Sequence, residues 1–133
     1  MDNCIFCKII KGEIPSYKIY EDEYVYAFLD IANDYYGHTL VVPKKHFENI
    51  INCNENELKN TISSVQKICN HYNKLGFSGM NVLTNTGKSS GQEVMHLHFH
   101  IIPRKDNDGL TIYSEQEKLN LDLNQVCNQL KMN

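Results

Sequence analysis

A segment in the last third of the chain alternates histidine with apolar residues. It reads His96-Leu97-His98-Phe99-His100-Ile101-Ile102. Residues two apart on a β-strand share a face, so this pattern predicts a strand with three imidazoles on one side and three apolar side chains on the other. The chain has six histidines in 133 residues, and half of them gather on this one surface. Histidine is costly on a buried face unless its ring nitrogens find partners, so a chemical role is the better explanation.

Three interpretations of the histidine row follow from imidazole chemistry. Clustered imidazoles can bind a metal ion. A neutral imidazole can attack phosphorus or a carbonyl carbon while its neighbours hold charge. The third interpretation is a half-buried polar strand that performs no chemistry, and the rest of the sequence has to decide among the three.

The first part of the chain predicts a short helix followed by three strands. Ile5, Phe6, Ile9 and Ile10 have helical spacing, and Gly12 ends that run. The predicted strands are rich in Tyr, Val, Ile and Phe and span 17–20, 24–29 and 39–42. The acidic residues 21–23 separate the first two strands, which predicts a hairpin.

A long amphipathic helix is predicted over 55–75. Its apolar side chains recur every three or four residues, and they are Leu58, Ile62, Val65, Ile68, Cys69, Tyr72 and Leu75. Asn54 and Glu57 predict a capping box at the start of this helix. Gly76 supplies its C-terminal stop.

Two more strands, over 80–84 and 94–102, and a C-terminal helix complete the prediction. The helix is expected to start at Ser114 or Asp122, and its inward-facing side chains are Val126, Cys127 and Leu130. Because the strands are mostly neighbours without helices between them, the sheet is expected to be antiparallel and the fold class α+β. We therefore predict one domain over 1–133, with a five-stranded antiparallel sheet, a core at about 4–104 and a C-terminal helical extension at about 114–131.

Charge and cysteine content exclude several classes of function. The formal net charge is −3, which disfavours a protein that grips a nucleic-acid polymer through its phosphates. No apolar stretch approaches the roughly 20 residues of a membrane span, and no secretory signal is visible. The five cysteines are an odd number, which favours free or metal-bound thiols over disulfides. We expect a cytoplasmic protein with no nucleic-acid and no membrane partner.

The loop before the histidine strand favours an anionic substrate. Residues 85–92 read Asn-Thr-Gly-Lys-Ser-Ser-Gly-Gln and offer backbone N–H groups and side-chain amides. Glycine lets the backbone approach an oxyanion closely. Arg104, just past the strand, is expected to add a positive charge. Beside three histidines, this loop supports phosphate binding.

These segments together resemble the histidine triad (HIT) family. The strand has that family's pattern of His-apolar-His-apolar-His-apolar-apolar, with Gly91-Gln92 shortly before it. An earlier match is Gly37-His38-Thr39-Leu40-Val41-Val42-Pro43-Lys44-Lys45-His46. The opening, which is similar to that of the bacterial-type HINT-like branch, is Cys4-Ile5-Phe6-Cys7-Lys8-Ile9-Ile10-Lys11-Gly12-Glu13-Ile14-Pro15. The resemblance covers about 4–104 and implies a HIT-like fold.

The resemblance implies a nucleotidyl hydrolase or transferase that acts at a nucleotide α-phosphate. By its place in the motif, His98 is expected to be the nucleophile and to form a covalent nucleotidyl-imidazole intermediate that water resolves. His100 is expected to contact the phosphate oxygens or the bridging atom. His96 and His38 complete the expected catalytic set, with His38 at the border of the site. No cofactor is expected to be required for catalysis.

The resemblance also implies a set of residues that bind a purine nucleotide. They are Ile14, Phe28, Asp30, Ile31, Asn85, Gly91, Gln92 and Glu93. Asp30 matches the acidic residue that binds the ribose hydroxyls, for which a carboxylate is a suitable acceptor. The three apolar members match positions near the base or ribose, where core packing explains them equally well. Asn85, Gly91 and Gln92 match positions that hold the phosphate and the bridging group.

Glu93 departs from the family pattern. Members near the eukaryotic branch carry Ser or Thr after Gly-Gln, where the hydroxyl donates to the leaving group. A carboxylate beside a phosphate repels it unless the carboxylate is protonated or turned away. The source of the leaving-group proton, and so the rate on phosphoramidates, is therefore open.

Cys4 and Cys7 form a Cys-x-x-Cys pair, which is half of a structural zinc site. A thioredoxin-type redox pair lacks its βαβ context here, and two unligated thiols on a short helix are the plain alternative. Because the other two histidines of the strand are needed for chemistry, His46 and His96 are the candidate ligands, as in similar bacterial relatives. We expect a structural zinc ion that ties the N-terminal helix to the histidine strand.

The sequence leaves four candidate functions. The leading one is hydrolysis of purine nucleoside phosphoramidates or adenylyl conjugates, and the closest alternative is hydrolysis of dinucleoside polyphosphates. A nucleotide-binding scaffold with weak catalysis and a metal hydrolase with zinc on the triad are the others. The resemblance further implies a homodimer with the long helix at its interface, and the apolar stripe over 55–75 is compatible with this.

Overall fold

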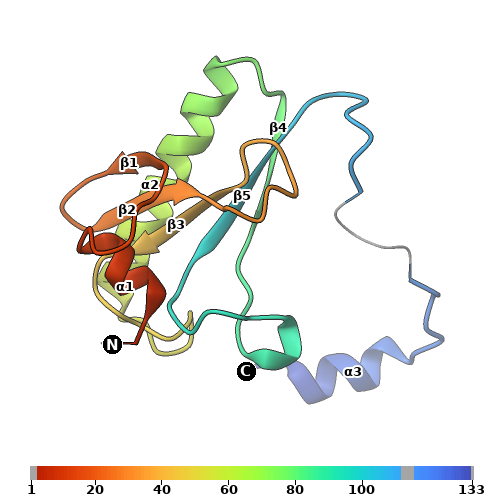
Figure 1. Ribbon diagram of the computed structural model, residues 1–133. Coiled ribbons are helices and arrows are strands. Elements are labelled where there is room, and N and C mark those ends of the chain that lie inside the picture. The colour runs from red at the N-terminus through yellow and green to blue at the C-terminus, as the bar shows by residue number, and fades with distance from the viewer. Residues whose placement is uncertain (1–2, 112–115, 133) are drawn as a thin grey trace.

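The computed structural model describes residues 3–111 and 116–132, and its centre is a five-stranded antiparallel sheet (Figure 1). The strands, in the spatial order β1-β2-β3-β5-β4, are Lys18–Glu21 (β1), Val25–Leu29 (β2), Thr39–Pro43 (β3), Gly79–Leu83 (β4) and Phe99–Arg104 (β5). The helices are Ile5–Ile10 (α1), Glu55–Lys74 (α2), Leu123–Leu130 (α3) and the short 3-10 helix Lys88–Ser90 (η1). The predicted α+β class and the five-stranded antiparallel sheet with one long helix and a C-terminal helix are confirmed.

The pleat of the sheet gives each face its own apolar cluster. The cluster on the α2 side consists of Val25, Ala27, Val41, Val65, Ile68, Tyr72, Leu97, Phe99 and Ile101. The cluster on the α1 side consists of Phe6, Ile9, Tyr26, Phe28, Leu40 and Val42. The apolar residues that alternate with the histidines all lie in the α2-side cluster. The histidines therefore face the α1 side, and the predicted two-faced arrangement is confirmed.

The register of the sheet sets the start of β3 between the end of β2 and the start of β5. Leu40 of β3 and Leu83 of β4 both pair with His100, one from each side of β5. The backbone N–H of Asp30, just after β2, donates to the carbonyl of His38, just before β3, at 2.9 Å. The carboxylate of Asp30 and the ring of His38 are thereby brought to the histidine face of β5.

Helix α2 begins as predicted and carries part of its apolar stripe outside the core. Oδ1 of Asn54 accepts a hydrogen bond from the backbone N–H of Glu57 at 2.9 Å. Gly76 follows the helix with a φ of 107°, in the left-handed region that favours glycine. Two members of the predicted stripe, Ile62 and Leu75, are 45% and 61% exposed. The stripe therefore extends beyond the core of this chain onto its surface.

The histidine strand is shorter than predicted at its start. Strand β5 begins at Phe99 rather than at residue 94. The backbone N–H of Leu97 donates to the carbonyl of Phe47 at 2.7 Å, so the chain there is held by the loop after β3. The alternation of side chains continues back through this segment, because the rings of His96 and His98 both contact the ring of Phe6 edge to face.

The prediction that the C-terminal helix packs inward is wrong. Helix α3 follows Asp122, whose side chain accepts from the backbone N–H of Asn124, but none of its residues is buried. Leu130 is 75% exposed, and neither Val126 nor Cys127 reaches the core. In Figure 1 the helix lies apart from the sheet. Its spacing is that of an amphipathic helix, but spacing alone does not say what covers the apolar face.

The other predicted start of that helix, Ser114, lies outside the described residues. Within 3–111 and 116–132, every helix is too short or too polar to cross a membrane.

Candidate active site and metal centre

His98, just before β5, and His100, within β5, lie close together on the α1 side of the sheet. The ring centroids of His98 and His100 are 5.0 Å apart. The ring of Phe6 packs edge to face against His98 with a centroid distance of 5.1 Å. His98 is buried, with an exposed fraction of 7%, and His100 is half-buried. Specific hydrogen bonds direct the nitrogens of both rings.

The tautomer of His98 is set by a backbone carbonyl. Nδ1 of His98 lies 2.7 Å from the carbonyl oxygen of His96, which is an acceptor only, so Nδ1 carries the proton and donates. Burial lowers the pKa of His98, with the hydrogen bond to His96 and the charge of Asp30 opposing this shift. A neutral ring protonated at Nδ1 has its lone pair on Nε2. A ring in this state is chemically able to act as a nucleophile through Nε2.

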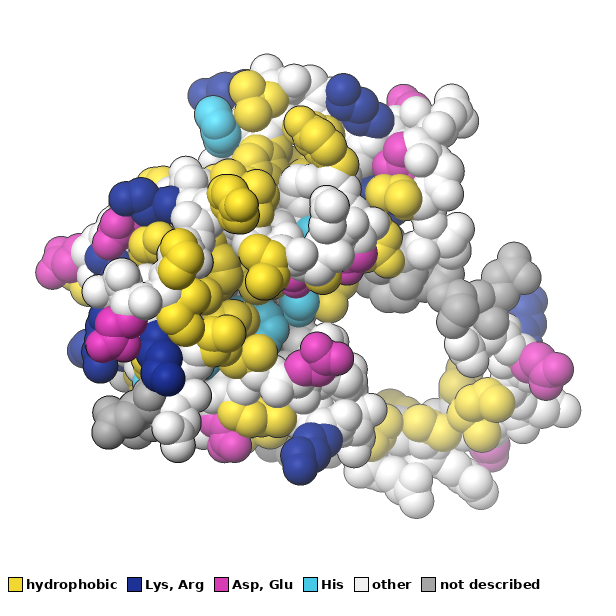
Figure 2. Space-filling view, in the orientation of Figure 1, with side chains coloured by type: hydrophobic (Ala, Val, Ile, Leu, Met, Phe, Trp, Pro, Cys, Tyr) yellow, Lys and Arg dark blue, Asp and Glu magenta, His cyan; other side chains and the backbone are white. Residues whose placement is uncertain are grey.

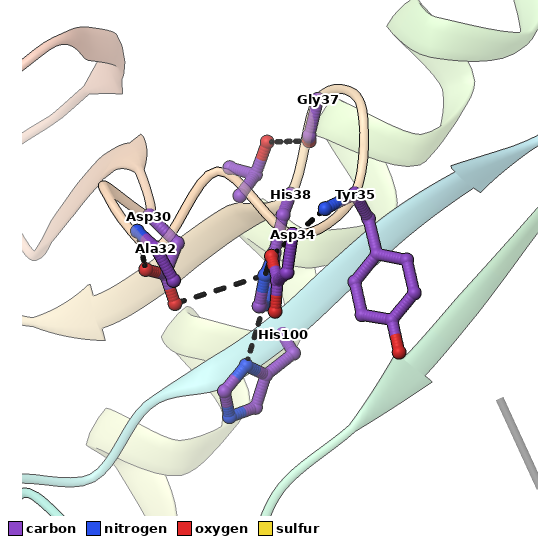
Figure 3. A network of polar contacts seen from close by, with 8 residues as sticks. Asp30, Ala32, Asp34, Tyr35, Gly37, His38 and His100 are labelled. Carbon is purple, nitrogen blue, oxygen red and sulfur yellow. Dashed lines mark hydrogen bonds and ion pairs between the residues drawn. The ribbon is translucent and has the colours of Figure 1, made fainter.

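A chain of polar contacts leads away from His100 (Figure 3). Nδ1 of His100 lies 2.8 Å from Nε2 of His38. Nδ1 of His38 lies 2.8 Å from Oδ1 of Asp34 and 3.7 Å from Oδ2 of Asp30. The far nitrogen of His100, Nε2, is buried and has no partner within the described residues. A buried ring nitrogen without a partner is costly, which indicates that a substrate group or water meets it in the working state.

The geometry of this chain is that of hydrogen bonds rather than of a metal site. Asp30, His38 and His100 are close enough to be considered as ligands. Two nitrogens bound tetrahedrally to one ion at about 2.0–2.1 Å lie roughly 3.3 Å apart. The 2.8 Å between the His38 and His100 nitrogens is shorter and matches a hydrogen bond. The distances disfavour the hypothesis of a catalytic metal on the triad.

A second cluster brings together the predicted zinc ligands, which are Cys4, Cys7, His46 and His96. Their ligating atoms all lie within 4.8 Å of one another. Nδ1 of His96 is 3.4 Å from Sγ of Cys4 and 3.5 Å from Sγ of Cys7, and Nδ1 of His46 is 3.4 Å from the same Cys7 sulfur. Sulfur and nitrogen ligands of a tetrahedral zinc ion are separated by roughly 3.5 Å. The donor set and its spacing therefore fit zinc.

The outer contact of His96 leaves the correct nitrogen free for a metal. Nε2 of His96 donates to the carbonyl of Pro43 at 2.9 Å, so its lone pair is on Nδ1, toward the thiols. Burial, with smaller effects from the neighbouring histidines, lowers the pKa of His96 to about 4. Burial also lowers the pKa of His46. Both rings are thus neutral at pH 7, as metal ligands must be.

His96 therefore takes part in the site differently from the other histidines. Both of its ring nitrogens are directed away from the position where a phosphate would meet His98, and the side chain is fully buried. Its backbone carbonyl is the group that reaches His98. In this geometry His96 can orient the ring of His98, and its catalytic role stays a prediction.

The loop between β4 and β5 is held in shape by Gln92. Its Nε2 donates to the carbonyls of Glu48 and Val94 at 2.7 and 3.0 Å, and its Oε1 accepts from the N–H of Gly87 at 2.8 Å. These bonds use the amide to shape the loop. Gly91 has a φ of 94°, and a Cβ there would lie 3.9 Å from the Asn85 amide nitrogen.

The predicted nucleoside-binding residues divide into surface and core. Asp30 and Ile31 line a hollow of about 380 Å³ together with Tyr17, Leu29 and Asn33, and Ile31 is 81% exposed. By contrast, Phe28 is buried and Ile14 packs against the α1-side cluster. Packing explains those two residues without a ligand. Glu93 is exposed.

Two features were missed or misplaced by sequence reasoning. Asp34 was not predicted, because no motif marks it and only the path of the loop brings its carboxylate to His38. Arg104 was expected to add positive charge near the phosphate. Its guanidinium is instead held by the carboxylate of Asp108, at 2.8 and 2.9 Å, and by the carbonyl of Leu110.

Comparisons with known proteins agree with this geometry. The HIT domain profile matches residues 11–107. An uncharacterized HIT-like protein of Methanocaldococcus jannaschii is 52% identical over 128 residues, which is 96% of this chain and 98% of that protein. The adenosine 5′-monophosphoramidase of Saccharomyces cerevisiae is 43% identical over 103 residues, which is 77% of this chain and 63% of that protein. The crystal structure of a Zn-bound histidine triad family protein from Mycobacterium smegmatis superposes with a TM-score of 0.80 at 33% identity and covers 87% of this chain and 85% of that one.

Proposed function

Because the chain belongs to the HIT domain family, we propose that it hydrolyses purine nucleoside phosphoramidates or related adenylyl conjugates at the α-phosphate. The observation that carries this proposal is the 2.7 Å hydrogen bond from Nδ1 of His98 to the carbonyl of His96. It leaves the lone pair of His98 on Nε2, where an attack on phosphorus begins. The similar yeast protein is a phosphoramidase by name, which supports the same class of leaving group.

The proposed reaction has two half-reactions. In the first, Nε2 of His98 forms a bond to the α-phosphorus as the bond from phosphorus to the leaving nitrogen breaks, and the leaving amine takes up a proton. In the second, a water oxygen attacks phosphorus, the bond to His98 breaks, and the water gives up a proton. The products are a nucleoside monophosphate and a free amine. His98 returns to its starting state.

The nucleotide is proposed to lie between the hollow beside Asp30 and the loop at Gly91. The carboxylate of Asp30 is 22% exposed, and among residues 3–111 and 116–132 it accepts one close hydrogen bond, from the N–H of Ala32 at 2.8 Å. It therefore has acceptor capacity left for the two ribose hydroxyls. Ile31, at the surface of the same hollow, offers apolar contact to a purine base.

The zinc ion is proposed to be structural. Cys4 and Cys7 lie at the start of α1, whereas His46 follows β3 and His96 precedes β5. An ion held by these four residues ties three distant parts of the chain together and binds no substrate. When bound, zinc supplies cross-linking of the fold, and the phosphate chemistry belongs to His98, His100 and their partners.

Dinucleoside polyphosphates are the second candidate substrates, since the same nucleophile serves both. The family resemblance sets Glu93 next to the leaving group, and its carboxylate is exposed. A polyphosphate leaving group is negatively charged and is repelled by a carboxylate, whereas an amine is not. The charge of Glu93 thus favours phosphoramidates over dinucleoside polyphosphates.

The active form is proposed to be a homodimer. Strand β4 is at an edge of the sheet, and its Val82 is 43% exposed. Apolar side chains gather on the face drawn in Figure 2. Tyr36, Leu75 and Phe77 line a hollow of about 400 Å³. Such a surface is typical of an interface between copies. Light scattering of the purified chain is expected to give twice the mass of one chain, and a monomer at working concentration contradicts this proposal.

The function is tested by assaying purified protein against adenosine 5′-monophosphoramidate and against a dinucleoside triphosphate. We expect AMP from the phosphoramidate, with a rate that His98→Ala lowers by at least about a thousandfold. His71→Ala, on the exposed face of α2, is the matched control and is expected to keep full activity. AMP binding by a wild-type chain that turns over neither substrate would indicate a nucleotide-binding scaffold instead.

A further inference from the structure

Asp34 is a carboxylate at the site that the proposed function has not used. Its Oδ1 lies 2.8 Å from Nδ1 of His38, and Nε2 of His38 lies 2.8 Å from Nδ1 of His100. The three side chains form one line that ends at the unpartnered Nε2 of His100 (Figure 3). The line runs from a carboxylate that is 43% exposed to a nitrogen that is buried. It connects the surface to the reacting centre.

The same atom positions accommodate two protonation states. In the neutral state, Nδ1–H of His38 donates to Asp34, Nδ1–H of His100 donates to His38, and Nε2 of His100 has a lone pair. In the charged state, one more proton is present and both nitrogens of His38 carry hydrogen, so Nε2–H of His38 donates to His100. Nε2 of His100 then carries a proton. Moving between the states shifts protons along hydrogen bonds and requires no change of rotamer.

The surroundings decide which ring holds the positive charge. Burial, and after it the neighbouring His98 and His38, lower the pKa of His100 to about 4. His38 faces the carboxylates of Asp34 at 2.8 Å and Asp30 at 3.7 Å. Burial raises the pKa of Asp34, but the hydrogen bond and charge of His38 outweigh this and hold it below its usual value. A positive charge on the His38 ring faces two carboxylates, whereas one on the His100 ring faces two other histidines.

We propose that Asp34 is a positioning residue that stores the leaving-group proton on His38, from which His100 delivers it. This inference rests on the proposed function. As the bond from phosphorus to nitrogen breaks, Nε2–H of His100 gives its proton to the leaving amine, and His38 passes its Nε2 proton to Nδ1 of His100. The line is then neutral. When water attacks the nucleotidyl-His98 bond, Nε2 of His100 takes the water's proton and the charge returns to His38.

The test compares two substrates that share the adenosine 5′-phosphoryl group. The leaving group of one needs a proton and the leaving group of the other does not. Adenosine 5′-monophosphoramidate releases an amine, which requires a proton. Adenosine 5′-(p-nitrophenyl) phosphate releases p-nitrophenolate, which leaves without one. The value of kcat/KM covers the steps up to departure of the leaving group, so it isolates the first half-reaction. The proteins are the wild type, Asp34→Ala, Asp34→Asn and the control Asp106→Asn, an exposed carboxylate of the loop after β5.

Loss of the Asp34 carboxylate is expected to lower kcat/KM for one substrate much more than for the other. Asp34→Ala is expected to lower kcat/KM for the phosphoramidate by about a hundredfold, the lower range for a lost proton transfer, and for the nitrophenyl ester by less than about threefold. Asp34→Asn keeps an acceptor for His38 but removes the charge, so a loss of intermediate size with the same split is expected. Asp106→Asn is expected to match the wild type.

The outcomes separate the inference from the function on which it rests. Equal losses on both substrates, or no loss on either, overturn the inference while the proposed function stands. A wild-type chain that cleaves neither substrate overturns the proposed function and the inference with it. Imidazole ¹⁵N spectra give a readout without substrate: both nitrogens of His38 are expected to be protonated in the wild type at a pH where only one is in Asp34→Ala. Identical His38 signals in the two proteins contradict the stored proton.

Discussion

The carbonyl oxygen of His96 lies 2.7 Å from Nδ1 of His98, so the residue whose ring faces the two thiols also orients the proposed nucleophile. The ring of His96 is held at Nε2 by Pro43 and directs Nδ1 toward Cys4 and Cys7. Its backbone is fixed as a result, and with it the acceptor that keeps the proton of His98 on Nδ1. The proposed metal centre and the proposed active site thus share one residue, through its ring and through its backbone carbonyl.

Loss of a thiol is expected to remove the metal and loosen the fold. Cys4→Ser leaves three of the four donors, so we expect wild-type protein to contain about one zinc per chain and the variant to contain almost none. The melting temperature of the variant is expected to fall by several degrees, since the cross-link between α1 and the histidine segment is gone. Elemental analysis and thermal denaturation measure both quantities. Cys127→Ser, at an exposed cysteine of α3, is the control. Equal zinc in wild type and Cys4→Ser contradicts the proposed ligand set.

Asp30 is expected to matter for substrates that have ribose hydroxyls. Asp30→Ala removes the acceptor for these hydroxyls, so we expect the dissociation constant for AMP to rise by about tenfold to a hundredfold, the loss of one or two hydrogen bonds to a charged group. Calorimetric titration with AMP and with its 2′,3′-dideoxy analogue makes the test specific. The wild type is expected to prefer AMP, and the variant to bind the two equally. If the variant still prefers AMP over the dideoxy analogue, the ribose hydroxyls do not bind Asp30.

Stability is expected to fall in mild acid because of His100. Burial and its histidine neighbours lower its pKa from 6.5 to about 4 in the folded chain. Between these two values the unfolded chain binds the extra proton and the folded chain does not, so unfolding becomes easier as the pH falls from about 6.5 to about 4. Urea denaturation at pH 7.5, 6 and 5 measures this slope. His100→Gln has no proton to bind in this range and is expected to show a shallower slope, whereas an unchanged slope assigns the effect to other groups.

Replacement of Glu93 is expected to change substrate preference. Glu93→Ser removes a negative charge from the loop between β4 and β5, and we expect cleavage of a dinucleoside triphosphate to rise relative to that of a phosphoramidate by about threefold to tenfold. Paired kcat/KM values give this ratio. Glu117→Ser, at an exposed residue before α3, is the control for a change in net charge. A ratio that does not move removes Glu93 from the leaving-group side of the site.

Much of the fold could be predicted because the spacing of apolar residues along a strand or helix follows from which side chains are buried within the chain. The alternation around His98 correctly predicted histidines on one face and apolar residues on the other, and Asn54 correctly marked the start of α2. The same reasoning failed for α3. The spacing of its apolar residues, Leu130 among them, does not say whether this chain or another molecule packs against them. The start of β5 was misplaced because ladder pairing depends on the neighbouring strand.

The site was predictable where it follows a local spacing and not where it depends on a loop's path. Cys4 and Cys7 are marked by their own spacing, and the structure brings them to His96, which is 92 residues away from Cys4. Asp34 has no such mark, because its contact with His38 exists only once the loop between β2 and β3 is closed by the sheet. Gln92 was associated with phosphate by resemblance, but its amide forms hydrogen bonds to Gly87 and Val94 beside it and to Glu48 in the segment after β3.

The most direct test of the account is to trap the intermediate on His98. Intact-protein mass spectrometry of His100→Asn, mixed briefly with adenosine 5′-(p-nitrophenyl) phosphate and quenched, is expected to show an added mass of one adenylyl group, because release of p-nitrophenolate needs no proton whereas attack by water has lost its base. Peptide mapping is expected to locate the group on His98, and the double variant with His98→Ala is expected to show none. Turnover by His100→Asn with no adduct at any time, or an adduct on another residue, contradicts the central claim that His98 is the nucleophile.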